Sequence, residues 1–117
     1  MQIQVGIISV SDRATQGVYD DAGGPALKEA AAGYGWEVVA EVVVPDEVRD
    51  IQRALREQVN KGCHLVLTTG GTGVAPRDVT PEAVREMAVR ELPGFGEVMR
   101  IESMKITPNA ILSRNLA

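Results

Sequence analysis

Three short runs of apolar and β-branched residues, separated by segments with helical spacing, most constrain how this chain can fold. The runs are residues 2–9 (QIQVGIIS), 36–44 (WEVVAEVVV) and 63–68 (CHLVLT). Runs of this length and composition are typical of buried strands. Strands that alternate with helices form a mostly parallel sheet with helices on both faces. The 117 residues therefore predict an α/β fold in a single domain, 1–117, with the third run at the centre of the sheet.

Proline, glycine and capping residues mark the ends of the expected helices. Asp46 is a candidate N-cap of the second helix, and Thr80 of the third. Residues 107–117 fit no single pattern. The four expected helices cover residues 25–34, 46–61, 81–91 and 95–104.

Net charge, apolar runs and cysteine count limit the classes of partner and the cellular compartment that fit this chain. Twelve Lys and Arg against sixteen Asp and Glu give a net charge of −4, which argues against nucleic acid as the main ligand. No apolar run approaches the roughly 18 residues of a membrane span, so we expect no membrane partner. Cys63 is the single cysteine, which indicates a reducing, cytoplasmic compartment and a core thiol. His64 has no second ligand at metal spacing, so we expect a buried, hydrogen-bonded histidine.

A glycine-rich loop directly follows the third apolar run. Thr69, Gly70, Gly71, Thr72 and Gly73 begin where a strand of an open α/β sheet would end, which is where such sheets bind ligands. Glycines allow backbone N–H groups to converge on an anion, and the threonines add hydroxyl donors. The loop is neither a Walker A loop nor a dinucleotide fingerprint. It predicts a phosphate-binding loop, with a plain glycine-rich turn as the alternative.

Two aspartates are expected at the same sheet edge as this loop. Asp46 follows the second run, and Asp78 precedes the third helix. As a pair they suit Mg²⁺ binding or acid–base chemistry. The alternatives are a helix cap for Asp46 and a solvated loop residue for Asp78. Arg77 would either pair with Asp78 or reach a phosphate.

Further polar residues are expected near this edge. Ser11 and Asp12 leave the first strand there, and Asp20-Asp21 precede a helix start. Ser113-Arg114 offers a hydroxyl and a permanent cation close to the end of the chain. Paired aspartates and single arginines are also common on solvated surfaces, so these residues carry less weight than the loop.

Six short motifs lie between residues 11 and 114. They are Ser11-Asp12-Arg13, Pro45-Asp46-Glu47, Thr68-Thr69-Gly70-Gly71-Thr72-Gly73, Arg77-Asp78-Val79-Thr80-Pro81-Glu82, Pro93-Gly94-Phe95-Gly96-Glu97 and Ala110-Ile111-Leu112-Ser113-Arg114. In order and spacing, the chain resembles the molybdopterin adenylyltransferase family, which includes MogA, MoaB and the N-terminal domain of gephyrin.

The resemblance implies a three-layer α/β/α sandwich around a mostly parallel sheet, the molybdopterin-binding fold, with one short antiparallel strand. It implies a cytoplasmic, Mg²⁺-dependent enzyme of molybdenum cofactor biosynthesis. This enzyme would use ATP to adenylylate molybdopterin, release pyrophosphate and assemble as a homotrimer or hexamer. The alternatives are a non-catalytic molybdopterin-binding module of the same fold and a scaffold. Family members continue past the Ser-Arg motif with a strand and a helix, which we expect this chain to lack.

The resemblance also assigns roles to residues. Asp46 and Asp78 match the family's functional aspartates, as catalytic residues and Mg²⁺ ligands. The expected substrate- and nucleotide-binding residues are Ser11, Asp12, Thr69, Gly70, Gly71, Thr72, Gly73, Ser113 and Arg114.

Overall fold

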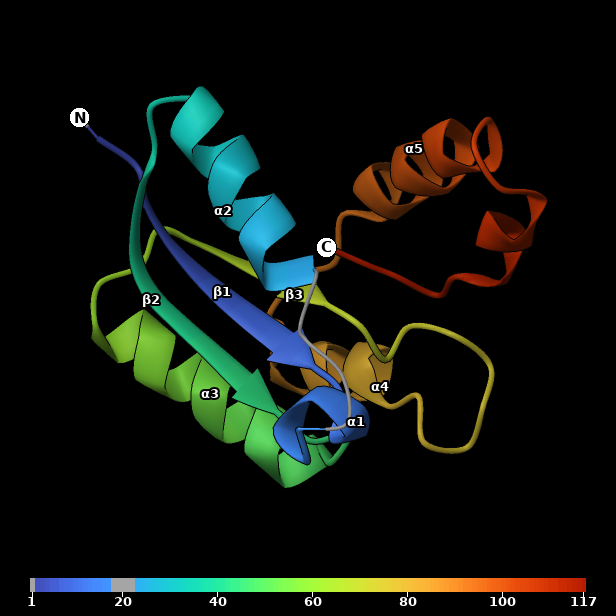
Figure 1. The fold of residues 1–117 in the computed structure, drawn as a ribbon, viewed down its shortest axis with the longest axis horizontal. Helices are drawn as coiled ribbons and strands as arrows, with labels where there is room; N and C mark the ends of the chain where they lie inside the picture. Colours follow the sequence, from blue (N-terminus) through green and yellow to red (C-terminus); the bar gives the residue numbers. More distant parts are fainter. Residues whose placement is uncertain (1, 18–22) are drawn as a thin grey trace.

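The computed structural model describes residues 2–17 and 23–117. Its sheet holds three strands, β1 (Gln4–Val10), β2 (Glu37–Val44) and β3 (Leu65–Thr69), in the order β2-β1-β3. Both strand pairings are parallel, as the alternating pattern predicts, and the described residues form no antiparallel strand. All three arrows in Figure 1 point to the same end of the molecule, where the candidate site residues were expected.

The prediction that the third run lies at the centre of the sheet is wrong. The central strand is β1, whose residues from Val5 to Val10 are all buried, whereas β3 is only half-buried along its length. A central strand bonds to a neighbour on each side and is covered on both faces. The first run contains as many apolar residues as the shorter third run, so apolar content alone does not set the strand order, which depends on tertiary packing.

Helices cover both faces of the sheet, which confirms the α/β/α layers (Figure 1). Helix α2 (Gly23–Gly33) packs on one face, while α3 (Val48–Asn60) and α4 (Thr80–Met87) share the other. Successive strand side chains point to opposite faces, so alternate residues of β1 serve different layers. The larger core lies on the α3 and α4 side and contains Ile8, Val10, Val44, Ile51, Ala54 and Ala83.

Helix α5 (Pro93–Met104) and the short 3₁₀ helix η1 (Pro108–Leu112) pack against each other, to one side of the sheet (Figure 1). After η1, the chain runs without regular structure through residues 113–117. None of the helices in the described ranges is both long and apolar enough to cross a membrane. The large apolar side chains of these two helices that remain exposed are Phe95, Val98, Met99, Ile101, Met104, Ile111 and Leu112.

Two expected helix caps have other roles in the structure. Helix α3 begins at Val48 after Glu47, and Asp46 instead accepts a hydrogen bond from the Asp12 N–H. Helix α4 already includes Thr80, whose hydroxyl donates to the Gly70 carbonyl. Both side chains satisfy backbone groups of a distant segment rather than of their own helix. Local sequence identifies a residue able to cap a helix, and tertiary contacts decide which backbone group it binds.

Two local expectations also need correction. Helix α4, the third of the expected helices, ends at Met87 rather than near Glu91, because the backbone of Ala88 is extended, with ψ of 135°. His64 is exposed rather than buried, although it is hydrogen-bonded: its Nδ1 accepts from the Gln4 N–H at 3.0 Å. The neighbouring Cys63 is a free, half-buried thiol.

Candidate functional site

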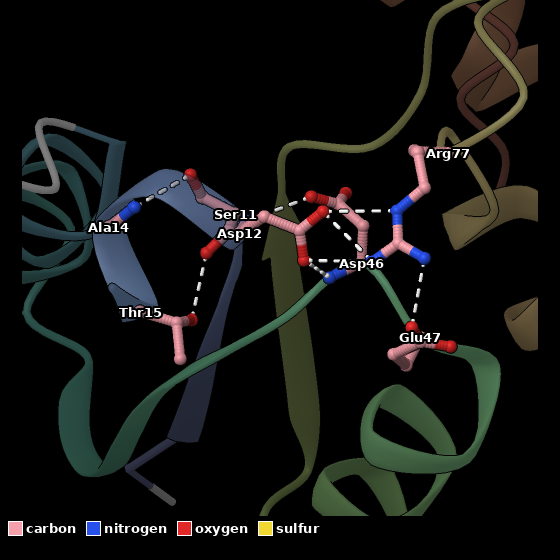
Figure 2. Close-up of polar contacts among 7 residues, drawn as sticks. All are labelled: Ser11, Asp12, Ala14, Thr15, Asp46, Glu47 and Arg77. Atoms are coloured by element: carbon pink, nitrogen blue, oxygen red, sulfur yellow. Dashed lines mark hydrogen bonds and ion pairs between the residues drawn. The ribbon is translucent and has the colours of Figure 1, made fainter. Parts of the chain in front are cut away.

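The candidate site lies at the carboxyl edge of the sheet, where three connecting segments meet. Residues 11–17 follow β1, residues 45–47 follow β2, and residues 70–79 follow β3. The Ser11 N–H donates to the Val44 carbonyl at 2.9 Å, which continues the pairing of β1 and β2 past the end of β1. Ser11 then caps the short helix α1 (Asp12–Thr15) by accepting from the Ala14 N–H (Figure 2).

Asp12 and Asp46 bind each other's backbone in a reciprocal clasp. The Asp12 N–H donates to Asp46 Oδ2 at 2.9 Å, and the Asp46 N–H donates to Asp12 Oδ1 at 2.9 Å (Figure 2). Each hydrogen bond links a backbone donor to a charged acceptor, a class stronger than neutral pairs. The clasp therefore fixes both carboxylates relative to the ends of β1 and β2.

Arg77 connects the loop after β3 to this clasp. Its Nε and Nη2 donate to Asp12 Oδ2 at 3.1 and 2.9 Å, and its Nη1 donates to Glu47 Oε1 at 2.8 Å (Figure 2). The Asp46 N–H, together with the Arg77 guanidinium, lowers the pKa of Asp12 below its ordinary value. Glu47 and Asp12 in turn raise the pKa of Arg77. Arg77 thus pairs with Asp12 and Glu47 rather than with Asp78.

The glycine loop runs between the two predicted aspartates. Gly70 and Gly71 have φ of 96° and 69°, a region that favours glycine. A Cβ on Gly71 would lie 3.1 Å from Asp46 Oδ1, and one on Gly73 would lie 2.7 Å from Asp78 Oδ2. Gly70 is exposed and the next three residues are half-buried, so solutes can reach the loop. The aspartates therefore flank an accessible loop at one sheet edge.

Asp78 closes the outer part of this loop. Its Oδ2 accepts from the Ala75 N–H at 2.9 Å, and its own N–H donates to the Ala75 carbonyl at 2.9 Å. Oδ1 of Asp78 and Oδ1 of Asp46 accept no hydrogen bond from the described residues. Each aspartate thus uses one oxygen to hold the backbone and leaves the other without a hydrogen bond from the described residues.

Ser113 and Arg114 lie behind the loop and hold it. Arg114 Nε donates to the Gly73 carbonyl at 2.8 Å, and Nη2 donates to the Asp78 carbonyl at 2.7 Å. Arg114 Nη1 pairs with Glu82 at 2.6 Å, which lowers the pKa of Glu82. The Ser113 hydroxyl donates to Thr72 Oγ1 at 3.3 Å. The guanidinium expected at the ligand is thus bonded to the loop backbone and Glu82.

The predicted site residues fall into two groups: Ser113 and Arg114 lie behind the loop, and the others come together at the sheet edge. Residues of the clasp and the loop come together at the sheet edge: Ser11, Asp12, Asp46, Thr69, Gly70, Gly71, Thr72, Gly73 and Asp78. Asp20-Asp21 lie outside the described residues. Among residues 2–17 and 23–117, no three Asp, Glu, His or Cys side chains lie together in a cluster that could hold a metal ion.

Sequence reasoning did not identify Glu47, nor did it find the partners of Arg77. Glu47 stands next to Asp46 in the Pro-Asp-Glu motif, so its position after the second strand was an available signal. Its pairing with Arg77 spans 30 residues of sequence, and that of Asp12 with Arg77 spans 65. No local pattern specifies contacts over such separations.

A family model described as MoCF_biosynth, a probable molybdopterin binding domain, matches residues 6–116. The chain belongs to this family. Two curated relatives of this chain are named molybdopterin adenylyltransferase. The protein from Escherichia coli K12 is 50% identical over 97% of this chain and 60% of its own length. The protein from Haemophilus influenzae is 50% identical over 97% of this chain and 59% of its own length.

Solved structures agree with the family assignment. The molybdopterin biosynthesis enzyme MoaB from Thermus thermophilus superposes with a TM-score of 0.92 at 46% identity. That match covers 99% of this chain and 74% of the MoaB chain. The domain thus spans about 60% of the length of the first curated relatives and about three-quarters of the solved MoaB chain.

Proposed function

We propose that this molybdopterin binding domain carries out the adenylylation of molybdopterin with ATP in molybdenum cofactor biosynthesis. The observation that carries the proposal is the placement of Gly71 beside Asp46 and Gly73 beside Asp78, at the carboxyl edge of a parallel sheet. Curated relatives at 50% identity bear the name of this activity. The products would be adenylyl-molybdopterin and pyrophosphate.

The reaction is a nucleotidyl transfer. A phosphate oxygen of molybdopterin attacks the α-phosphorus of ATP, and the bond from that phosphorus to the oxygen bridging to the β-phosphorus breaks. The electron pair leaves with pyrophosphate. Such transfers depend on positioning and on neutralisation of charge more than on covalent chemistry. The loop from Gly70 to Gly73 would supply backbone donors to phosphate oxygens, and Asp46 or Asp78 would orient the attacking phosphate.

The two aspartates also fit a magnesium ion. Mg²⁺ prefers oxygen ligands and is usually held by one or two carboxylates together with substrate phosphates and water. The Oδ1 atoms of Asp46 and Asp78, which accept no hydrogen bond from the described residues, would be the two carboxylate ligands, and substrate phosphates and water would supply the others. When bound, the ion would offset negative charge on the α-phosphate and on the leaving pyrophosphate.

Asp78→Asn tests the proposal. The substitution should abolish ATP-dependent pyrophosphate release with molybdopterin, while circular dichroism and urea unfolding show an intact fold. Asp50→Asn is the matched control, because Asp50 pairs with Arg53 of the same helix rather than with a residue of the loop, and activity should persist. Activity of Asp78→Asn within a few-fold of the wild type would remove Asp78 from the mechanism.

A second candidate is a module that binds molybdopterin without adenylylating it. The family description, a probable molybdopterin binding domain, favours this candidate. Calorimetry separates the two functions. The enzyme should bind molybdopterin and Mg-ATP, whereas the module should bind molybdopterin alone.

We extend the proposal to assembly and location. The family resemblance supports assembly as a homotrimer or hexamer. The resemblance and the single cysteine both support a cytoplasmic location. Molybdopterin and ATP are the proposed partners, with no role for nucleic acid or membranes.

A further inference from the structure

Arg77 is the cation that bridges all three segments at the sheet edge. It lies on the segment after β3 and binds Asp12, which follows β1, and Glu47, which follows β2 (Figure 2). Its side chain is 57% exposed, and single exposed ion pairs contribute little to stability. Two Arg77 nitrogens on one carboxylate, with a third on another, instead restrict how the segments are oriented.

The orientation imposed by Arg77 extends to Asp46 through Asp12. Arg77 holds both oxygens of Asp12, with Nη2 at 3.0 Å from Oδ1 and 2.9 Å from Oδ2. The same Oδ1 accepts the Asp46 N–H, and the Asp12 N–H holds Asp46 Oδ2. The remaining oxygen, Asp46 Oδ1, faces Gly71 of the loop. A change in Asp12 orientation would therefore move the oxygen that is free for a ligand.

Arg77 also offsets negative charge at this edge. Four carboxylates lie around the loop, those of Asp12, Asp46, Glu47 and Asp78. Arg77 forms ion pairs with two of them, Asp12 and Glu47. Without this cation, carboxylates would face the phosphates of a nucleotide directly, and their repulsion would oppose binding and transfer.

We propose that Arg77 is a positioning residue of the adenylyl transfer, which orients Asp46 toward the glycine loop by holding the Asp12 carboxylate. This inference rests on the proposed function for its kinetic consequence, and on the clasp alone for its structural consequence. The inference assigns this role to Arg77 and not to Arg85, which is also an exposed arginine in an ion pair. Arg85 is 56% exposed and pairs with Glu91 at 3.2 Å, outside the three segments.

The kinetic experiment compares Arg77→Gln, Arg77→Lys and Arg85→Gln with the wild type. Arg77→Gln should lower kcat for pyrophosphate release about 10- to 100-fold, because small displacements of an orienting group are costly, and should leave the urea midpoint nearly unchanged. The KM for ATP should rise by a smaller factor than kcat falls, because the unpaired Asp12 and Glu47 carboxylates would repel the nucleotide phosphates while the loop contacts persist. Arg77→Lys should recover part of kcat, as lysine keeps the charge but not the fork. Arg85→Gln should match the wild type.

Amide hydrogen exchange tests the clasp independently of activity. In Arg77→Gln, the Asp46 N–H should exchange faster, because its acceptor, Asp12 Oδ1, is no longer held, while Arg85→Gln should leave the rate unchanged. Unchanged Asp46 exchange, or kcat of Arg77→Gln within twofold of an active wild type, would overturn the inference. A wild type that releases no pyrophosphate would instead contradict the proposed function, and exchange would still decide the role of Arg77.

Discussion

The contacts of Asp12 at the sheet edge depend on the negative charge of its carboxylate. Its carboxylate accepts the Asp46 N–H and pairs with Arg77, and these contacts lower its pKa below the ordinary value of 3.8. A lowered pKa means that the folded state holds this proton less tightly than the unfolded state does. The group therefore stabilises the fold above about pH 4, and this contribution is lost as pH falls through the folded pKa.

Asp12→Asn should reduce stability at pH 7 and make the loss of stability on acidification shallower than in the wild type. Protonation of Asp12 no longer contributes in the variant, while Glu82 and Glu91, whose pKa values are also lowered by arginines, still do. Urea unfolding between pH 7 and pH 2 measures both effects. Identical slopes for wild type and variant would show that the Asp12 contacts do not stabilise the fold.

The close contact between helix α3 and strand β1 depends on Gly6, which has no side chain. A Cβ on Gly6 would contact the side-chain amide of Gln58, with Cδ at 2.7 Å, and would lie 3.1 Å from Cys63 Sγ. Gln58 is buried and donates to the Ile7 carbonyl at 2.9 Å. The helix therefore sits against the central strand where a side chain is absent.

Gly6→Ala should lower the free energy of unfolding by about 1–3 kcal/mol, the usual cost of overpacking a core. Gly33→Ala is the matched control, since a Cβ there meets nothing within 4 Å at the exposed end of α2, and stability should hold or rise slightly. Urea unfolding of both variants makes the comparison. An equal response of the two variants would contradict the close approach of α3 to β1.

Across the whole molecule, helices bury the sheet on both faces, whereas α5 and η1 leave much of their apolar surface exposed. The α/β/α layers bury β1 completely from Val5 to Val10, whereas α5 and η1 expose apolar side chains such as Phe95, Ile101 and Ile111. Apolar surface exposed to water raises the free energy of an isolated chain. Contiguous exposed apolar surface is a feature of proteins that associate.

The proposed assembly predicts that the protein sediments at the mass of three or six copies of the 12.5 kDa chain. Analytical ultracentrifugation over a range of protein concentrations gives this mass directly. A monomer at all concentrations would contradict the homotrimer or hexamer without touching the assignment to the family.

Features of the fold that follow from local spacing can be predicted from the amino-acid sequence alone. The alternation of strand and helix periods predicts parallel strands with helices on both faces, and the glycines after the third strand predict an accessible loop between Asp46 and Asp78 at the sheet edge. These features depend on neighbours a few residues apart, whose geometry the backbone sets. The six motifs were also sufficient to predict the family.

The identity of the central strand and the partners of the polar side chains follow from packing between distant segments. Arg77 reaches across 65 residues to Asp12, and Asp12 across 34 to Asp46, while Arg114 bonds to the loop rather than standing free. A long polar side chain has many rotamers and several eligible partners, so sequence defines what it can bind. Packing of the sheet edge selects the partner, because it brings three segments within hydrogen-bond distance.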